Sequence, residues 1–486
     1  MDTDTFQKEK TTKYLAHAHS ILYGKCMKQE IIKKLQACVG KKNLLTAEEE
    51  RACYSFDASG QGPLPDAVAL PDSAKQIAAL LRLAGEYHFP VIPRGAGSGM
   101  TGGALPVQGG LVITFSRMNR ILEIDADNMI AVVEPGVITG ELQSALKKHG
   151  LMYPPDPASL NFCTIGGNAA ECAGGPSAVK YGVTRDYIIG LEVVLPSGAI
   201  MSTGVRTEKG VVGYDLTHLF IGSEGTLAVF SKLILRLLPL PEKKVTFLLS
   251  FTSLGRATGM VAEILRAGLV PCTLEYMDRT AIKVVQERMH TIPGADTAAL
   301  LLIEFDGTAE DVDKQTARFI DFAGTQDDCQ LQMAADEQET AELWQARRAI
   351  APASLSLRPH KISEDVVVPR TRIPELVEYT EQLAREHNLT ILTFGHAGDG
   401  NIHVNIMLDK TDSQEYDHGN RAKEQLFEKV INMGGTLSGE HGIGMTKAEF
   451  LPMELDRPTL EIMEQIKTVF DPDGILNPGK IFPKAD

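Results

Sequence analysis

The segment that follows Arg94 restricts the fold of this chain strongly, because it holds five glycines within nine residues, Gly95 to Gly103. Residues Gly97 to Gly102 match the pattern G-x-G-x-x-G. A nicotinamide-binding fold would need a helix to begin here, so that its N-terminus could hold a pyrophosphate. Pro106 and Gly109-Gly110 exclude that helix. A non-helical loop with free backbone N–H groups can still bind a phosphate, and so many glycines are costly in backbone entropy unless something requires them.

Two further glycine-rich segments follow along the chain. The second runs from Thr164 to Gly175 and continues to Gly182, and the third is Gly222 to Val229. Between them, residues 188–195 and 199–203 alternate as two strands joined by Pro196-Ser-Gly198, which predicts a β-hairpin.

The stretch Phe394 to Asn405 predicts a second hairpin with histidines on one face. Asp399-Gly400 favours a two-residue type I′ turn, which would place His396 directly opposite His403. Opposed Cβ atoms lie roughly 5 Å apart, so the two imidazoles could share one metal ion. Asn405 would point to the same side as His403. For these two histidines alone, a surface hairpin with no ligand is the alternative.

Glu440 and His441 lie in a glycine-rich run, Gly434 to Gly444, which suggests a shaped loop or a close approach to a cofactor. Adjacent residues of an extended segment point in opposite directions, so we expect these two side chains to have different roles. His396, His403 and Glu440 together would make a site of two histidines and one carboxylate with open positions, as in catalytic zinc and non-heme iron sites.

Composition excludes several classes of protein. A formal net charge of -15 argues against nucleic-acid binding, which needs a basic face. None of the seven cysteines forms a C-x-x-C pair, so we expect reduced thiols and neither an iron–sulfur cluster nor a zinc knuckle within this chain. We expect no signal peptide and no membrane span, and hence a cytoplasmic protein, peripheral to a membrane only through a partner.

Periodicity predicts an α+β architecture in four parts. Residues 1–26 form an N-terminal extension, residues 27–241 a first domain, residues 242–444 a second α+β domain, and residues 445–486 a C-terminal segment. A helix is expected over residues 72–88, and residues 237–244, with two prolines and then charges, are expected to form a linker. Beyond it strands and helices alternate, which is typical of an α+β domain.

The three glycine-rich segments and their order resemble the vanillyl-alcohol-oxidase/p-cresol-methylhydroxylase family, in its branch of glycolate oxidase flavin subunits, D-lactate dehydrogenases and D-2-hydroxyglutarate dehydrogenases. The resemblance runs from about Leu45 to Pro483. It implies FAD held between two small subdomains, and a cap domain whose antiparallel sheet faces the flavin. Ser98 stands in the loop where relatives with covalent flavin carry a histidine, so non-covalent FAD is expected. The FAD contacts that it implies are Arg94, Gly95, Ala96, Gly97, Ser98, Gly99, Thr101, Gly102, Pro135, Gly136, Thr164, Gly166, Gly167, Asn168, Gly174, Gly182, Glu224, Gly225, Val229 and Asn477.

The same resemblance assigns roles in the second domain. It makes His396, His403 and Glu440 the ligands of a divalent metal, zinc by expectation, with iron or manganese as alternatives. Asn405 and His441 match substrate-contacting residues, with His441 as the expected general base. Arg347 matches the arginine of a Trp-x-x-Arg motif that grips a carboxylate, a task suited to its planar fork. Arg348 is the competing assignment, and for Lys361 substrate contact and an ordinary solvated lysine remain equally open.

These residues predict an FAD- and metal-dependent dehydrogenase that oxidises a D-2-hydroxy acid, D-lactate or glycolate, to the 2-oxo acid. A D-2-hydroxyglutarate-type dehydrogenase is the alternative, and it would need a second cation, for which Lys361 is the candidate. A flavoprotein subunit without its own catalysis is the third interpretation. Reduced flavin also implies a separate electron acceptor: an iron–sulfur subunit, an electron-transferring flavoprotein, or a quinone or cytochrome. A homo- or hetero-oligomer is compatible with all of these.

Overall fold

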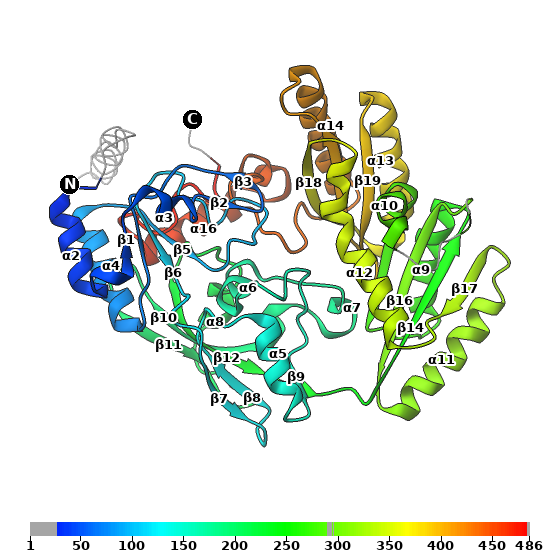
Figure 1. Cartoon of the computed structure of the whole chain (residues 1–486), viewed down its shortest axis with the longest axis horizontal. Coiled ribbons are helices and arrows are strands. Elements are labelled where there is room, and N and C mark those ends of the chain that lie inside the picture. The colour runs from blue at the N-terminus through cyan, green and yellow to red at the C-terminus, as the bar shows by residue number, and fades with distance from the viewer. Residues whose placement is uncertain (1–26, 289–293, 295, 484–486) are drawn as a thin grey trace.

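The computed structural model describes residues 27–288, 294 and 296–483. The expected extension of residues 1–26 lies outside the described residues. The chain forms two lobes that lie side by side (Figure 1). The first lobe comprises residues 27–242 together with 445–483, and the second lobe comprises residues 243–444.

A four-stranded sheet forms one half of the first lobe. Its strand order is β1 (Leu44–Leu45), β4 (Ala67–Ala69), β6 (Leu111–Thr114) and β5 (Val91–Arg94). Helices α2 (Gln29–Val39) and α4 (Ala74–Tyr87) pack their apolar faces on it. The chain end returns here, because Val91 donates to the carbonyl of Ile475 and accepts from the backbone N–H of Asn477, both at 2.8 Å.

A five-stranded antiparallel sheet forms the other half. Its order is β11 (Ile200–Gly204), β10 (Ile188–Val194), β12 (Val229–Arg236), β8 (Ile130–Val133) and β7 (Ile121–Asp125), and β10–β11 confirms the hairpin predicted after Tyr187. Helices α5 (Thr139–Lys147), α6 (Ile165–Glu171) and α8 (Leu216–Phe220) share its core. The lobe also contains the long helix α16 (Arg457–Phe470). Its short elements are α3 (Glu48–Ala52), β2 (Phe56–Asp57), β3 (Gly60–Gln61), β9 (Leu151–Met152), α7 (Ala178–Tyr181), β13 (Leu238–Pro239) and α15 (Leu451–Glu454).

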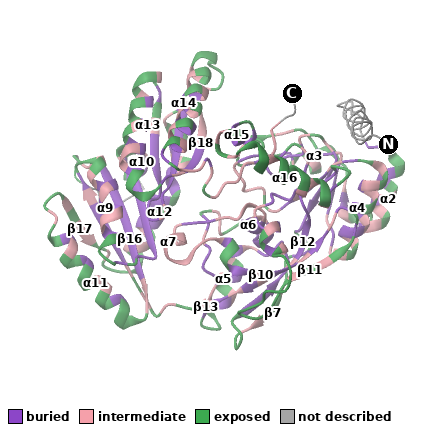
Figure 2. Ribbon diagram, turned by 180° about the vertical axis from the view of Figure 1, so that it is seen from behind, coloured by how far each residue is buried: buried purple, intermediate pink, exposed green. Residues whose placement is uncertain are grey.

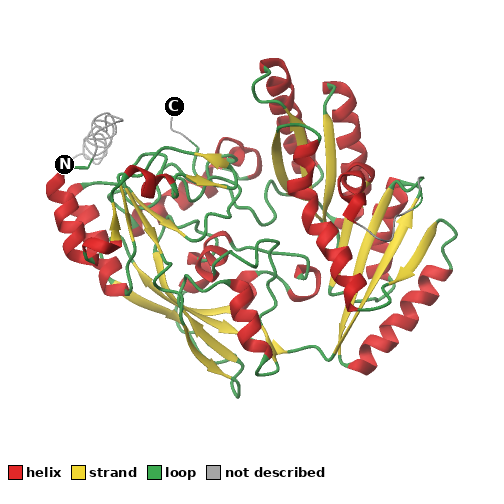
Figure 3. Cartoon of the chain, viewed as in Figure 1, coloured by secondary structure: helices red, strands yellow, loops and turns green. Residues whose placement is uncertain are grey.

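The second lobe is built on a seven-stranded antiparallel sheet. Its order is β17 (Cys329–Met333), β14 (Lys243–Phe251), β16 (Ala299–Gly307), β15 (Thr273–Asp278), β19 (Thr390–His396), β20 (Asn401–Leu408) and β18 (His360–Val367). One face is covered by α9 (Leu254–Arg266), α11 (Ala309–Gly324), α13 (Ile373–His387) and α14 (Ser413–Asn432). In the described part of the chain, the helices on the other face are α10 (Arg279–Val285) and α12 (Glu337–Ala353), which cover part of its area. Figure 2 shows that the strands of this sheet are largely buried, and Figure 3 shows them between the helices.

Strand alternation places polar residues on the more open of these two faces. Asp365 pairs with His403 and Ser363 pairs with Asn405 across β18 and β20, so each pair shares one face. His396 is buried near His403 on the adjacent strand, and Glu275 of β15 contacts it. These polar side chains gather on neighbouring strands of one face of the sheet. This part of the face is therefore the candidate site for chemistry.

Two local predictions were wrong. The turn of the 394–405 hairpin has four residues, Ala397 to Gly400, so His396 pairs with Asn401, and Phe394 lies opposite His403. The slip of two residues keeps both histidines on the same face, as diagonal neighbours. The expected linker is also partly structured, because Leu238–Pro239 pairs with β9 and β14 already begins at Lys243.

The second glycine-rich segment holds a helix that its glycines did not indicate. Helix α6 starts at Ile165, and the side chain of Thr164 caps it by accepting from the backbone N–H of Gly167 at 3.1 Å. Across the described residues, no helix is long and apolar enough to cross a membrane.

Candidate active site

A cavity lies where the glycine-rich loops of the first lobe meet the second lobe. The predicted residues that line it are Arg94, Gly95, Ala96, Gly97, Ser98, Gly99, Pro135, Thr164, Gly166, Gly167, Asn168, Glu224 and Gly225. Glu440 and His441 of the second lobe line the same cavity. The nucleotide loops and the residues of the expected chemistry therefore share one space.

The walls of this cavity fit a dinucleotide phosphate. Arg94 is 4% exposed, and Nη1 of its guanidinium has no hydrogen-bond partner among the described residues. Such a buried, unsatisfied cationic donor is costly without an anion. A Cβ on Gly95 would lie 2.5 Å from Thr164 Oγ1, and one on Gly97, at φ +72°, would overlap the Arg94 guanidinium. These glycines therefore let Thr164 and Arg94 lie close against the loop that lines the cavity.

Several of the expected FAD contacts do not line the cavity and instead support its walls. Asn477 fastens two loops, since its Nδ2 donates to the carbonyls of Gly103 at 2.9 Å and Glu224 at 2.7 Å. Thr101 donates from Oγ1 to the carbonyl of His441 at 2.9 Å. Val229 is fully buried in the core. The remaining ones are glycines that pack against backbone or side chains: Gly102, Gly136, Gly174 and Gly182.

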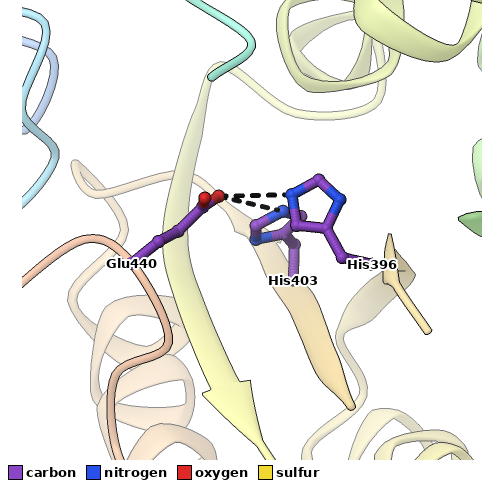
Figure 4. Close-up of side chains that lie close together, drawn as sticks. All are labelled: His396, His403 and Glu440. Atoms are coloured by element: carbon purple, nitrogen blue, oxygen red, sulfur yellow. Dashed lines mark hydrogen bonds and ion pairs between the residues drawn. The ribbon is translucent and has the colours of Figure 1, made fainter. Parts of the chain in front are cut away.

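His396, His403 and Glu440 converge on one point in the second lobe (Figure 4). Glu440 Oε1 lies 3.3 Å from His396 Nε2 and 3.7 Å from His403 Nε2. One tetrahedral ion with bonds of ~2.1 Å separates its ligands by about 3.4 Å. The two imidazoles meet edge to face with centroids 5.1 Å apart. The donor set, and the two distances from Glu440 to the histidines, therefore suit a divalent metal.

The charges within this triad are complementary. Burial lowers the pKa of His396, but Glu275 and Glu440 outweigh burial and hold that pKa well above its usual range. Burial and the neighbouring His396 keep the pKa of His403 well below normal. Glu440 stays ionised despite its burial, because His396 and the other imidazoles lower its pKa to about 2. A cation entering here would take the place of the His396 proton.

His441 forms a dyad with Asp365. Its Nδ1 lies 3.3 Å from Asp365 Oδ1, and its ring stacks on that of His403 with centroids 5.5 Å apart. The opposite orientation expected for Glu440 and His441 is wrong, because the segment bends around Asp365 and His441 Nε2 lies 3.9 Å from Glu440 Oε1. The bend is held by Asp365 Oδ2, which accepts backbone N–H bonds from Gly439, Glu440 and His441 at 2.8 to 3.0 Å.

Arg347 of α12 lies beside the triad. Its guanidinium is nearly buried, lies 4.8 Å from the centroid of the Phe394 ring, and bonds Glu275. The competing residue, Arg348, points elsewhere, over the ring of Trp344. Arg347 is therefore the arginine that the fold brings to the site.

Asn405 and Lys361 lie further along the same face. Asn405 Oδ1 accepts from Ser363 Oγ at 2.7 Å, while its buried Nδ2 has no partner in the described part of the chain. Lys361 Nζ donates to the carbonyl of Ala351 at 3.2 Å, and burial lowers its pKa. Both side chains thus retain donors that an anionic or hydroxylated molecule could accept from.

Sequence reasoning missed three carboxylates of this region. Glu275 lies within the largely buried strand β15, where a carboxylate between apolar residues was an available signal, whereas Asp365 lies in β18, whose mixed polar sequence offered none. Glu171, at the end of α6, lines the cavity, and its Oε2 is buried without a partner among the described groups. Burial and the nearby Glu224 raise the pKa of Glu171 well above normal.

Comparison with known proteins identifies the family. The model of the C-terminal domain of FAD linked oxidases matches residues 240–481, and that of an FAD binding domain matches residues 65–204. The glycolate oxidase subunit GlcD of Bacillus subtilis (strain 168) is 41% identical over 457 residues, which cover 94% of this chain and 97% of that protein. The chain belongs to the FAD-linked oxidases, so it is an FAD-linked oxidoreductase, and the predicted FAD domain is confirmed.

Other relatives agree with this assignment. A D-lactate dehydrogenase of Anaerostipes hadrus is 34% identical over 470 residues, covering 93% of this chain and 97% of that protein. The structure of p-cresol methylhydroxylase with substrate bound superimposes with a TM-score of 0.78 at 18% identity, covering 93% of this chain and 96% of that one. The predicted α+β architecture is therefore confirmed.

Proposed function

We propose that this protein oxidises a D-2-hydroxy acid, D-lactate or glycolate, to the corresponding 2-oxo acid and passes the hydride to non-covalent FAD. One observation carries the proposal: a cavity built for a dinucleotide ends at a triad of two histidines and a carboxylate, with a histidine and an arginine beside it. The names of the relatives, a glycolate oxidase subunit and a D-lactate dehydrogenase, support this substrate class.

The roles of the residues follow from their positions. Arg347 binds the substrate carboxylate, and Asn405 Nδ2 donates to substrate. His441 Nε2 takes the hydroxyl proton, while Asp365 holds Nδ1–H and stabilises the imidazolium that forms. His396, His403 and Glu440 would hold a divalent metal, zinc or else iron or manganese, which when bound lowers the pKa of the hydroxyl. When bound, FAD accepts the hydride from C2.

A single experiment tests this function. The purified flavoprotein is mixed anaerobically with a panel of D- and L-2-hydroxy acids while flavin absorbance is followed. We expect D-lactate or glycolate to bleach the flavin fastest, and L-isomers to be slow. Flavin that no member of the panel bleaches would favour a subunit without its own catalysis.

A dicarboxylate substrate such as D-2-hydroxyglutarate is the second candidate. Lys361 favours it, because this half-buried cation lies on the face of the triad and its Nζ donates only to a backbone carbonyl in the described structure. A second carboxylate would satisfy that charge. The same panel decides between the two, since a diacid would then outcompete D-lactate and the Lys361→Met variant would lose that preference.

Reoxidation of the flavin requires a separate acceptor in this proposal. An iron–sulfur subunit, an electron-transferring flavoprotein, or a quinone or cytochrome would accept the electrons. A hetero-oligomer would hold an iron–sulfur subunit close to the flavin. A cytoplasmic location, at a membrane only through such a partner, completes the proposal.

A further inference from the structure

Glu275 is a fully buried carboxylate that bonds two different parts of the active site. Through Oε1 it contacts His396 Nδ1 at 2.6 Å. Through Oε2 it accepts from Arg347 Nε at 2.7 Å and contacts Nη2 at 2.5 Å. One side chain of β15 thus joins a ligand of the proposed metal to the proposed anchor of the substrate.

The bond to His396 determines which ring nitrogen can bind a metal. A carboxylate accepts only, so Nδ1 of His396 carries a hydrogen toward Glu275, and Nε2 is the nitrogen that would exchange its proton for a metal at the triad. Carboxylates in this position fix the ring of a metal-binding histidine and raise its basicity. Glu275 therefore prepares His396 as a ligand.

The bonds to Arg347 determine which edge of the guanidinium remains free. Nε and Nη2 face Glu275, while the ring of Phe394 lies 4.8 Å from the guanidinium carbon. Held in this way, the guanidinium keeps Nη1 and the second hydrogen of Nη2 for an incoming carboxylate. The long arginine side chain is thereby ordered before substrate arrives.

We propose that Glu275 is a positioning residue that couples divalent-metal binding to carboxylate binding. The coupling rests on the proposed function, because it requires a metal at the triad and a carboxylate at Arg347. Linkage makes it reciprocal: bound metal increases affinity for the carboxylate, and bound carboxylate increases affinity for metal by the same factor.

Replacement of Glu275 by glutamine isolates this role. Glutamine has a single acceptor oxygen, so it can accept from His396 or from Arg347 but not from both, and its NH₂ would face a donor. Glu304 provides a matched control on the same face of the sheet. It is also buried and accepts from Trp344 Nε1 at 2.8 Å and Thr246 Oγ1 at 2.7 Å.

The test measures Co²⁺ affinity and the visible d–d absorption of Co²⁺ in the FAD-loaded protein after chelation. Carboxylate affinity is measured with 2-hydroxyisobutyrate, which lacks a hydrogen on C2 and cannot be oxidised. We expect Glu275→Gln to weaken Co²⁺ binding roughly 10- to 100-fold and probe binding at least about 10-fold. Glu304→Gln should leave both within about threefold, and Arg347→Lys should weaken only probe binding.

Each outcome decides the proposal. Unchanged Co²⁺ affinity in Glu275→Gln, an equal loss in Glu304→Gln, or a native protein that binds no Co²⁺ would overturn it. If Glu275→Gln does not fold, Glu275→Asp, with both oxygens retained on a shorter side chain, must show the joint loss in milder form. Native protein that binds Co²⁺ and the probe but oxidises no hydroxy acid would refute the proposed function and leave the coupling intact.

Discussion

His441 is the residue whose side chain is best placed to move the substrate proton. It touches Asp365 through Nδ1 and leaves Nε2 toward the triad. We expect His441→Ala to slow flavin reduction by the hydroxy acid about 10²- to 10⁴-fold, as measured by anaerobic stopped-flow absorbance, because general-base catalysis is worth that much. His387→Ala, in a helix on the opposite face of the sheet, is the control, and near-normal reduction in the His441 variant would refute the assignment.

The triad makes a separate prediction at the residue scale. His403→Ala and Glu440→Gln each remove one of three expected ligands. We expect both variants to lose most bound metal in elemental analysis while retaining FAD, because Arg94 and the glycine-rich loops that line most of the cavity are unchanged in both. Native protein that keeps full turnover after chelation would contradict a catalytic metal.

Asp156 predicts a pH-dependent stability. Burial raises its pKa to about 6, although Ser177 donates to it from Oγ and from the backbone N–H. Its folded pKa exceeds the unfolded value of about 3.9, so this residue favours folding at low pH and loses that contribution as pH rises through 6. As the pH rises from 4 to 6, the native chain should therefore lose free energy of unfolding relative to the Asp156→Asn variant. The difference should be on the order of 1 to 2 kcal/mol, a value reduced because Asp156 is partly exposed.

Denaturant unfolding of both proteins at several pH values measures this difference. Asparagine can replace both bonds, since Oδ1 accepts from the backbone N–H and Nδ2 donates to Ser177 Oγ. Stability curves that stay parallel from pH 4 to 7 would show that Asp156 titrates normally.

At the scale of elements, the loop after β5 requires a glycine at position 97, where no other residue type fits. Gly97 has φ +72°, and a Cβ there would overlap the guanidinium of Arg94. We expect Gly97→Ala to lose most bound FAD, measured as the ratio of flavin to protein absorbance. Gly259→Ala within α9 is the control, because nothing lies within 4 Å of the added Cβ, and it should stabilise the chain by about 0.4 to 1 kcal/mol.

At the scale of the whole molecule, a hydrogen-bonded group of Lys180, Tyr181 and Asp306 joins the two lobes, and it is called the polar latch below. Lys180 Nζ and Tyr181 Oη of α7 donate to Asp306 Oδ1 of β16 at 2.6 and 2.9 Å. We expect Asp306→Asn to lower the free energy of unfolding by about 2 kcal/mol, because a largely buried charge-assisted pair is lost. Asp313→Asn, whose partner Lys243 is exposed, should change it by less than about 0.5 kcal/mol, and equal effects would argue against the latch.

Sequence alone predicted much of the fold and the members of the triad, because these depend on local patterns of residues along the chain. Strand and helix periodicity in residues 243–408 and the hairpin after Tyr187 are local properties of the chain. Glycines and prolines of residues 95–110 excluded a helix without any tertiary information. The register of the 394–405 hairpin was mispredicted because turn propensity alone was considered, whereas the sheet on both sides also constrains that turn.

The sequence by itself determined which side chains were available: two histidines at odd spacing, a Glu-His pair between glycines, an arginine on a helix and loops that leave N–H groups free. Only the tertiary structure decided their partners. Glu275 is 121 residues from His396, and Asp365 is 76 residues from His441, yet each bonds that histidine. Pairing of strands distant in sequence depends on sheet order and burial together, so no local pattern could have assigned these two carboxylates to the site.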